Sequence, residues 1–77
     1  MKVEIKLPGG NWFPVAGVEA LPAGPRWELT VRSPRPMRVR DLEKIQVRID
    51  GVAAQNVVGI TGAKKPGDEF KVNFTLP

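Results

Sequence analysis

The chain has 77 residues, contains no Cys and no His, and carries twelve Lys and Arg against eight Asp and Glu, a formal net charge of +4. A chain of this length is predicted to form a single domain over residues 1–77, and such a domain buries only about 60% of the surface that its unfolded chain exposes. The missing residue types exclude disulfides, thiolate zinc sites and imidazole ligands, so packing alone must stabilise the fold.

The first half of the chain is predicted to form three strands. Residues 2–7 alternate charged with apolar side chains, which is the period-two pattern of a half-buried strand. Pro8-Gly9 then suits the two central positions of a type II turn, and a less regular apolar segment follows at residues 12–18. Residues 26–32 resume the alternation and form the third of these strands.

The middle of the chain is less regular. Residues 37–39 are predicted to form a short strand, and residues 44–50 form a longer one with clear alternation. The only stretch with helical composition, residues 39–46, has room for no more than one turn. Because Leu42 is out of phase with the strands on either side, a bulge, a corner or one helical turn is expected at residues 41–43.

The last third of the chain contains the clearest turn signals. Asp50-Gly51 predicts a tight hairpin between residues 45–49 and 52–58, because both central residues of the favoured two-residue turn need positive φ. Pro66-Gly67 predicts a second type II turn before the alternating strand at residues 70–76.

These elements predict an all-β fold, a small antiparallel β-sandwich or partly open barrel of six to seven short strands. The apolar residues that point inward from these strands form the predicted core. They are Val3, Ile5, Leu7, Trp27, Leu29, Val31, Ile45, Val47, Ile49, Val58, Phe70, Val72, Phe74 and Leu76.

The residue types argue against catalysis. Without His, Cys and Tyr, the usual general bases and activated nucleophiles are missing. The paired acids Asp41 with Glu43 and Asp68 with Glu69 are better explained by neighbouring arginines and by a turn than by a catalytic or cation-binding role. We therefore expect no enzymatic activity, no metal, no cofactor and no small-molecule substrate.

All of the excess positive charge lies in residues 26–48, which hold seven cations and three acids. The cations are Arg26, Arg32, Arg35, Arg38, Arg40, Lys44 and Arg48. If they gather on one face of a sheet, that face is a candidate site for an acidic protein or for the phosphates of a nucleic acid. The alternatives are a solvated face, or arginines that protect a strand edge from pairing with other chains.

Trp12 and Phe13 form a second candidate binding site. Two adjacent aromatic residues cannot both point inward from a regular strand, so one ring is expected to be exposed and available to anchor a protein partner. The alternative is a bend that lets both rings cap the open end of the core.

The C-terminal part resembles a known class of module. The hairpin sequence Ile45-Gln46-Val47-Arg48-Ile49-Asp50-Gly51 and the later Pro66-Gly67-Asp68-Glu69-Phe70-Lys71-Val72-Asn73-Phe74 are similar to the hairpin and terminal strand of immunoglobulin-like modules in bacterial and phage structural proteins. The resemblance covers under half of the chain and lacks the cysteine pair and tyrosine corner of antibody-type domains. It implies a small sandwich that serves as an adhesive, spacer or decoration unit, and it implies no site residues.

Three functions remain open from the sequence. The first is a non-catalytic structural or interaction module, a subunit or decoration unit of a larger assembly such as a virus particle, with a protein partner or a second copy of itself. The second is a small-barrel nucleic-acid-binding domain that contacts phosphates through Arg26, Arg32, Arg38, Arg40 and Arg48. The aromatic residues are not expected on the face of these cations, since Trp27, Phe70 and Phe74 alternate inward and only Trp12 and Phe13 lie near a loop, which favours charge attraction over base stacking. The third is a small inhibitor that docks on an acidic protein surface.

The N-terminal residues alternate charged with apolar side chains, unlike the apolar run of a signal peptide. No apolar stretch approaches the ~20 residues that cross a bilayer. These features predict a cytoplasmic or virion location and no membrane partner.

Overall fold

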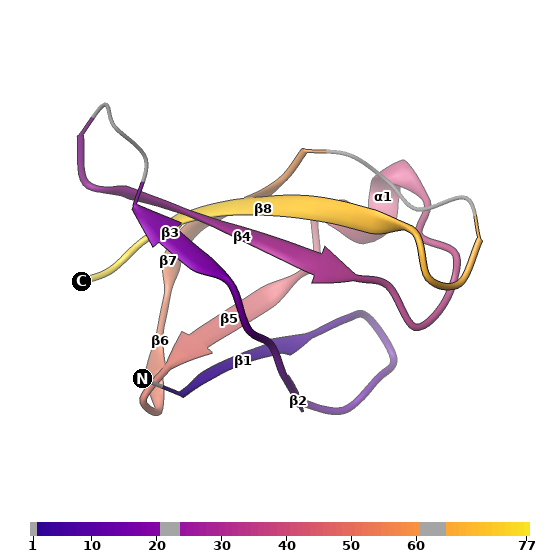
Figure 1. Ribbon diagram of the computed structural model, residues 1–77, viewed down its shortest axis with the longest axis horizontal. Helices are drawn as coiled ribbons and strands as arrows, with labels where there is room; N and C mark the ends of the chain where they lie inside the picture. The colour runs from indigo at the N-terminus through magenta and orange to yellow at the C-terminus, as the bar shows by residue number, and fades with distance from the viewer. Residues whose placement is uncertain (1, 21–23, 61–64) are drawn as a thin grey trace.

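The computed structural model describes residues 2–20, 24–60 and 65–77, which form two antiparallel four-stranded sheets packed face to face (Figure 1). The elements are β1 (Val3–Lys6), β2 (Phe13–Pro14), β3 (Val18–Ala20), β4 (Arg26–Arg32), α1 (Val39–Leu42), β5 (Gln46–Ile49), β6 (Val52–Ala53), β7 (Gln55–Gly59) and β8 (Glu69–Thr75). Sheet A has the strand order β2-β1-β5-β6, and sheet B has the order β3-β4-β8-β7. The predicted all-β fold is confirmed, as a sandwich whose sheets do not close into a barrel.

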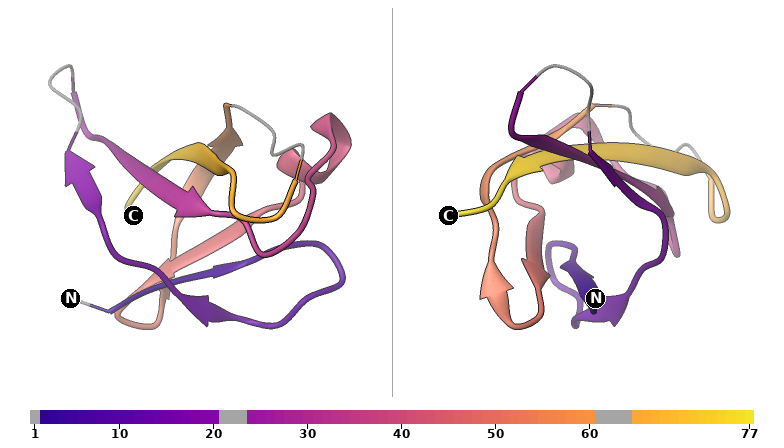
Figure 2. Two further views of the ribbon diagram at one scale, coloured as in Figure 1. Left: turned by 45° about the vertical axis from the view of Figure 1, so that its right-hand side comes forward. Right: turned by 60° about the vertical axis from the view of Figure 1, so that its left-hand side comes forward.

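Two of the predicted strands bend and pass from one sheet to the other (Figure 2). In the segment predicted at residues 12–18, β2 pairs with β1 in sheet A and β3 pairs with β4 in sheet B. Gly17 lies between them with a φ of 90°. In the segment predicted at residues 52–60, β6 pairs with β5 and β7 pairs with β8, with only Ala54 between β6 and β7. Strands that change sheets in this way form the corners of a sandwich.

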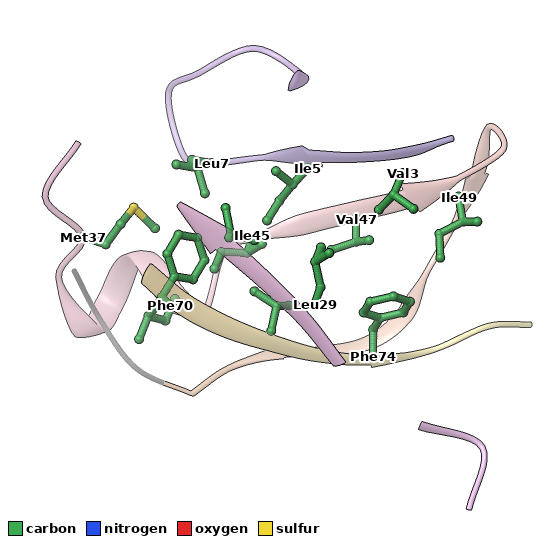
Figure 3. Packing of buried hydrophobic residues seen from close by; sticks show 13 residues of the cluster. Val3, Ile5, Leu7, Leu29, Met37, Ile45, Val47, Ile49, Phe70 and Phe74 are labelled. Carbon is green, nitrogen blue, oxygen red and sulfur yellow. The ribbon is translucent and has the colours of Figure 1, made fainter. Parts of the chain in front are cut away.

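The core lies between the sheets, where side chains from both inner faces meet (Figure 3). Its buried hydrophobic residues are Val3, Ile5, Leu7, Leu29, Val31, Met37, Leu42, Ile45, Val47, Ile49, Phe70, Val72 and Phe74. Of the predicted core residues, Trp27 and Leu76 are only partly buried and pack against this cluster. Val58 is exposed, so its placement in the core is wrong.

A β-bulge in β7 explains why Val58 points outward. The β7–β8 register shifts between Gln55 and Val58, so one extra residue on β7 faces β8. Asn56, in the bulge, has a φ of 53° and donates a hydrogen bond from its side-chain amide to Thr75 Oγ1 (2.9 Å). An extra residue reverses the inward and outward phases that follow it. Val57 therefore takes the inward position and packs against the core.

The three predicted turns are confirmed. Asp50 and Gly51 have φ values of 50° and 82° and connect the paired Ile49 and Val52. The other two turns are closed by hydrogen bonds from Gly10 N–H to the Leu7 carbonyl (3.0 Å) and from Asp68 N–H to the Lys65 carbonyl (3.2 Å). The glycine before each of these donors has positive φ, as a type II turn requires.

A single helical turn replaces the strand predicted at residues 37–39, so that prediction is wrong. Helix α1 begins at Val39, and the Asp41 side chain accepts a hydrogen bond from Arg38 N–H (2.9 Å) just before it. The turn lets Leu42 point into the core beside Gly59 of β7. Met37 is buried as well, so the segment closes one end of the core rather than adding a strand.

Candidate interaction surfaces

The structure separates the arginines that the sequence predicts to gather on one face. Arg26 and Arg32 lie at the two ends of β4 in sheet B, and both are exposed. Arg48 lies on β5 in sheet A, between the buried Val47 and Ile49. Because the inner faces of the sheets pack together, outward residues of β4 and β5 lie on opposite sides of the molecule (Figure 1). The prediction of one continuous basic face is therefore wrong.

The outer face of sheet B carries balanced charge. It presents three acids and three bases, namely Glu19, Glu28, Glu69, Arg26, Arg32 and Lys71. Lys71 Nζ lies 3.4 Å from a carboxylate oxygen of Glu28 on the neighbouring strand. Arg32 Nη2 lies 3.8 Å from Glu69, and both side chains are exposed. Exposed pairs of this kind contribute little stability, and a face with equal numbers of both signs does not attract an acidic partner.

Arg35 has a structural role rather than the binding role predicted for it. Its Nη2 donates to the Pro8 carbonyl (2.6 Å) and thereby holds the segment after β4 against the turn after β1. The buried Ser33 hydroxyl donates to the Arg35 carbonyl, which fixes the backbone there. Because the guanidinium is already engaged and the residue is half-buried, it is poorly placed to meet a partner.

Arg38, Arg40 and Lys44 surround α1 at one end of the sandwich (Figure 1). All three are exposed, and within the part of the chain that the structure describes none of their side chains forms an ion pair. Asp41 and Glu43 lie in the same segment, so three bases stand against two acids and the segment carries a net charge of +1. Its cations do not join the outward arginines of either sheet.

The adjacent Trp12 and Phe13 point to opposite sides of sheet A. Phe13 lies opposite Ile5 in the β1–β2 pair and packs against the core. The Trp12 ring lies on the outer face, where the guanidinium carbon of Arg48 is 4.1 Å from the ring centroid. Only one of the two rings therefore points toward the core, but the other is not fully exposed as expected. Trp12 is half-buried, because Arg48 covers one of its faces.

Glu4 completes a stack of three side chains with Trp12 and Arg48. Glu4 lies directly opposite Arg48 in the β1–β5 pair, and Arg48 donates from Nε to Oε1 (2.8 Å) and from Nη2 to Oε2 (3.1 Å). The hydrogen bond from Arg48 lowers the pKa of Glu4 and is only partly opposed by desolvation. The same bond raises the pKa of Arg48. Both side chains are thus held charged and in one geometry.

The sequence did not single out Glu4. The alternation in residues 2–7 places Glu4 on the outer side of its strand, and the alternation in residues 44–50 does the same for Arg48. That shared outward position was the only hint of the pair in the sequence. Pairing them also requires that β1 and β5 be neighbours, which their distance in the sequence does not reveal.

An open hollow of about 360 Å³ borders the stack. Trp12 and Arg48 line it together with small residues before, in and after β6, including Gly51, Ala53 and Ala54. The hollow gives this face a concave region beside a fixed aromatic ring, which is the shape that receives a protruding side chain of a partner.

Other kinds of site find little support in the described residues. In residues 2–20, 24–60 and 65–77, no three acidic side chains are grouped closely enough to hold a metal ion. Within the same ranges, no helix has the length and apolar character that a membrane crossing needs.

The chain was compared with protein-family models, curated proteins and solved structures, and none of the three comparisons found a match. The resemblance of the C-terminal part to immunoglobulin-like modules stays a prediction.

Proposed function

We propose that this protein is a non-catalytic interaction module, a subunit or decoration unit of a larger assembly such as a virus particle, which docks on an acidic protein surface through the outer face of sheet A. The observation that carries the proposal is the stack of Trp12, Arg48 and Glu4 on that face.

The composition of the stack favours protein recognition. Trp and Arg are the residue types most enriched among those that dominate binding energy at protein interfaces. Here the two Glu4 hydrogen bonds hold Arg48, and Arg48 in turn holds the Trp12 ring. Side chains that are ordered before binding lose less conformational entropy when a partner arrives.

The charges on this face favour an acidic partner. Lys2, just before β1, and Lys6, at its end, alternate with buried residues and therefore face outward, as Glu4 does. Neither lysine forms an ion pair among the described residues. Both nearby acids are already engaged, Glu4 with Arg48 and Asp50 with the backbone N–H of Lys2 (2.8 Å). Lys2, Lys6 and Arg48 are three bases against the two acids Glu4 and Asp50, so this side of the sheet has a net charge of +1, which attracts acidic surfaces.

The test is selection of binders from a library of random peptides displayed on phage, followed by affinity measurements on the enriched peptides. We expect peptides in which Asp and Glu flank an apolar residue, and we expect their affinity to fall with added salt. Trp12→Ala and Lys6→Glu should each reduce binding at least tenfold, because the first removes the aromatic anchor and the second reverses a local charge.

Arg26→Glu is the matched control for Lys6→Glu, because it makes the same change of charge on the opposite face. It should leave affinity within about twofold. Equal losses in both charge-reversal variants, or no enrichment of acidic peptides, would contradict the proposal. So would salt-sensitive binding of mixed-sequence single-stranded DNA that the double variant Arg38→Ala, Arg40→Ala weakens, since that result favours a nucleic-acid partner.

A further inference from the structure

Strand β7 is the longest edge strand in the part of the chain that the structure describes. In the order β3-β4-β8-β7 it has β8 on one side and no strand on the other. It has five residues, whereas the other edge strands, β2, β3 and β6, have two, three and two. An edge of this length offers a second chain several backbone groups to pair with.

The direction of the free backbone groups follows from the pairing with β8. Ile60 N–H donates to the Lys71 carbonyl (2.9 Å), and Val58 lies opposite Asn73. Backbone groups alternate between the two sides of a strand, so those of Gly59, and by the same alternation Val57, point away from β8.

Strand β7 carries the bulge at Asn56, but it lacks the two other features that most often protect an edge, charge and proline. It contains no charged residue and no proline, whereas β2 contains Pro14 and β3 contains Glu19. Val58 and Ile60 remain 50% and 48% exposed along it. Edge strands that must stay single generally carry Lys, Pro or an inward-pointing charge.

The charge distribution indicates which partner fits this edge. Two copies of a chain with a net charge of +4 repel each other wherever that excess is concentrated. Most of the described excess lies on the outer face of sheet A and around α1, where Lys2, Lys6, Arg38, Arg40 and Lys44 lie, while Lys65 lies in the connection between β7 and β8. The outer face of sheet B is balanced and β7 itself is uncharged. A second copy meets the least repulsion here, and an acidic protein gains nothing from this edge.

We propose that two copies of the chain pair antiparallel through β7 about a twofold axis. Gly59 of each copy would exchange backbone hydrogen bonds with Val57 of the other, and the Val58 side chains of the two copies would meet at the axis. Sheet B would then continue across the dimer. This proposal goes beyond docking through sheet A and does not depend on it, since it uses the opposite face.

The test is sedimentation velocity of the full chain over a series of concentrations. Because few residues pair, we expect a weak dimer whose population rises with concentration. Val58→Lys should raise the dissociation constant at least about tenfold, since it removes the apolar contact and places two like charges opposite each other. Thermal melting of the variant checks that the monomer fold is kept.

Val52→Lys is the matched control, because Val52 is also 50% exposed but lies on β6. It should leave the dimer unchanged. A second readout is amide hydrogen exchange, which should slow at Gly59 as the concentration rises. A chain that stays monomeric at every concentration would overturn the proposal, as would a dimer that survives Val58→Lys or that Val52→Lys weakens equally. A dimer dispersed only by Lys6→Glu would place self-association on sheet A and would also overturn it.

Discussion

Leu42 packs directly over the backbone of Gly59, so closely that a Cβ atom built on Gly59 would lie 2.7 Å from Leu42 Cβ. The contact joins α1 to β7 and closes one end of the core, where Leu42 is buried. Gly59 needs no unusual backbone conformation, so its requirement for glycine comes from this close approach alone.

Gly59→Ala should therefore destabilise the fold by about 1–3 kcal/mol, the usual cost of inserting a methyl group into a packed contact. Urea unfolding followed by tryptophan fluorescence measures the loss. Gly10→Ala is the control, because a Cβ there would meet only the Leu7 carbonyl oxygen at an ordinary 3.5 Å. In a double-mutant cycle with Leu42→Gly, which removes the Cβ atom that the new methyl group would meet, the alanine at Gly59 should cost clearly less; additive losses would show that the two residues do not interact.

The stability of the fold should depend on pH through Glu4. Its folded-state pKa is lowered from 4.5 by the hydrogen bond from Arg48, so the carboxylate stabilises the folded chain above that unfolded value. The stabilisation is lost as the pH falls through the lowered folded-state pKa. Unfolding midpoints in urea between about pH 6 and pH 2 should fall less steeply for Glu4→Gln than for the parent.

Glu19→Gln removes another acid and is the control for this experiment. Glu19 is exposed on β3, and its side chain forms no hydrogen bond or ion pair within the described residues. Its variant should keep the pH dependence of the parent. If Glu4→Gln also kept it, the pair with Arg48 would contribute nothing to the pH dependence of stability.

Two aromatic residues of sheet B, Trp27 and Phe74, should differ in their contribution to stability. The sequence predicts equal roles for Trp27 and Phe74 in the core, but Phe74 is 1% exposed and Trp27 is only half-buried. Phe74→Ala should cost about 3–5 kcal/mol and leave so small a domain largely unfolded, while Phe74→Leu should cost less and still permit measurement. Trp27→Ala should cost clearly less than Phe74→Ala when melting is followed by circular dichroism; an equal or larger loss would contradict this ranking.

The strands were predictable wherever the alternation is local and uninterrupted. Residues 26–32 and 70–76 place Leu29, Val31, Phe70 and Val72 inside, and the structure buries all four. The alternation could not reveal the bulge at Asn56, because an extra residue leaves no mark on composition yet reverses the phase at Val58.

The arrangement of the candidate site was less predictable than the strands. Residues 12–18 and 52–60 each divide between two sheets, and that division depends on which distant strands they meet. The pair of Glu4 with Arg48 joins residues 44 positions apart. A local pattern shows that both residues face outward, but not that β1 lies beside β5. For the same reason the sequence could not show that β4 and β5 turn their arginines to opposite sides.

We expect the Arg35 side chain to stabilise the folded chain. Its Nη2 donates to the Pro8 carbonyl at 2.6 Å across 27 positions of the chain, from a half-buried position. Arg35→Ala should lower the free energy of unfolding by about 1–3 kcal/mol, because it removes a charged donor and leaves that carbonyl without its partner. Arg26→Ala removes the same charge from an exposed position and should change stability by less than about 0.5 kcal/mol in the same urea titration. Equal effects of the two variants would show that Arg35 acts only through the net charge of the chain.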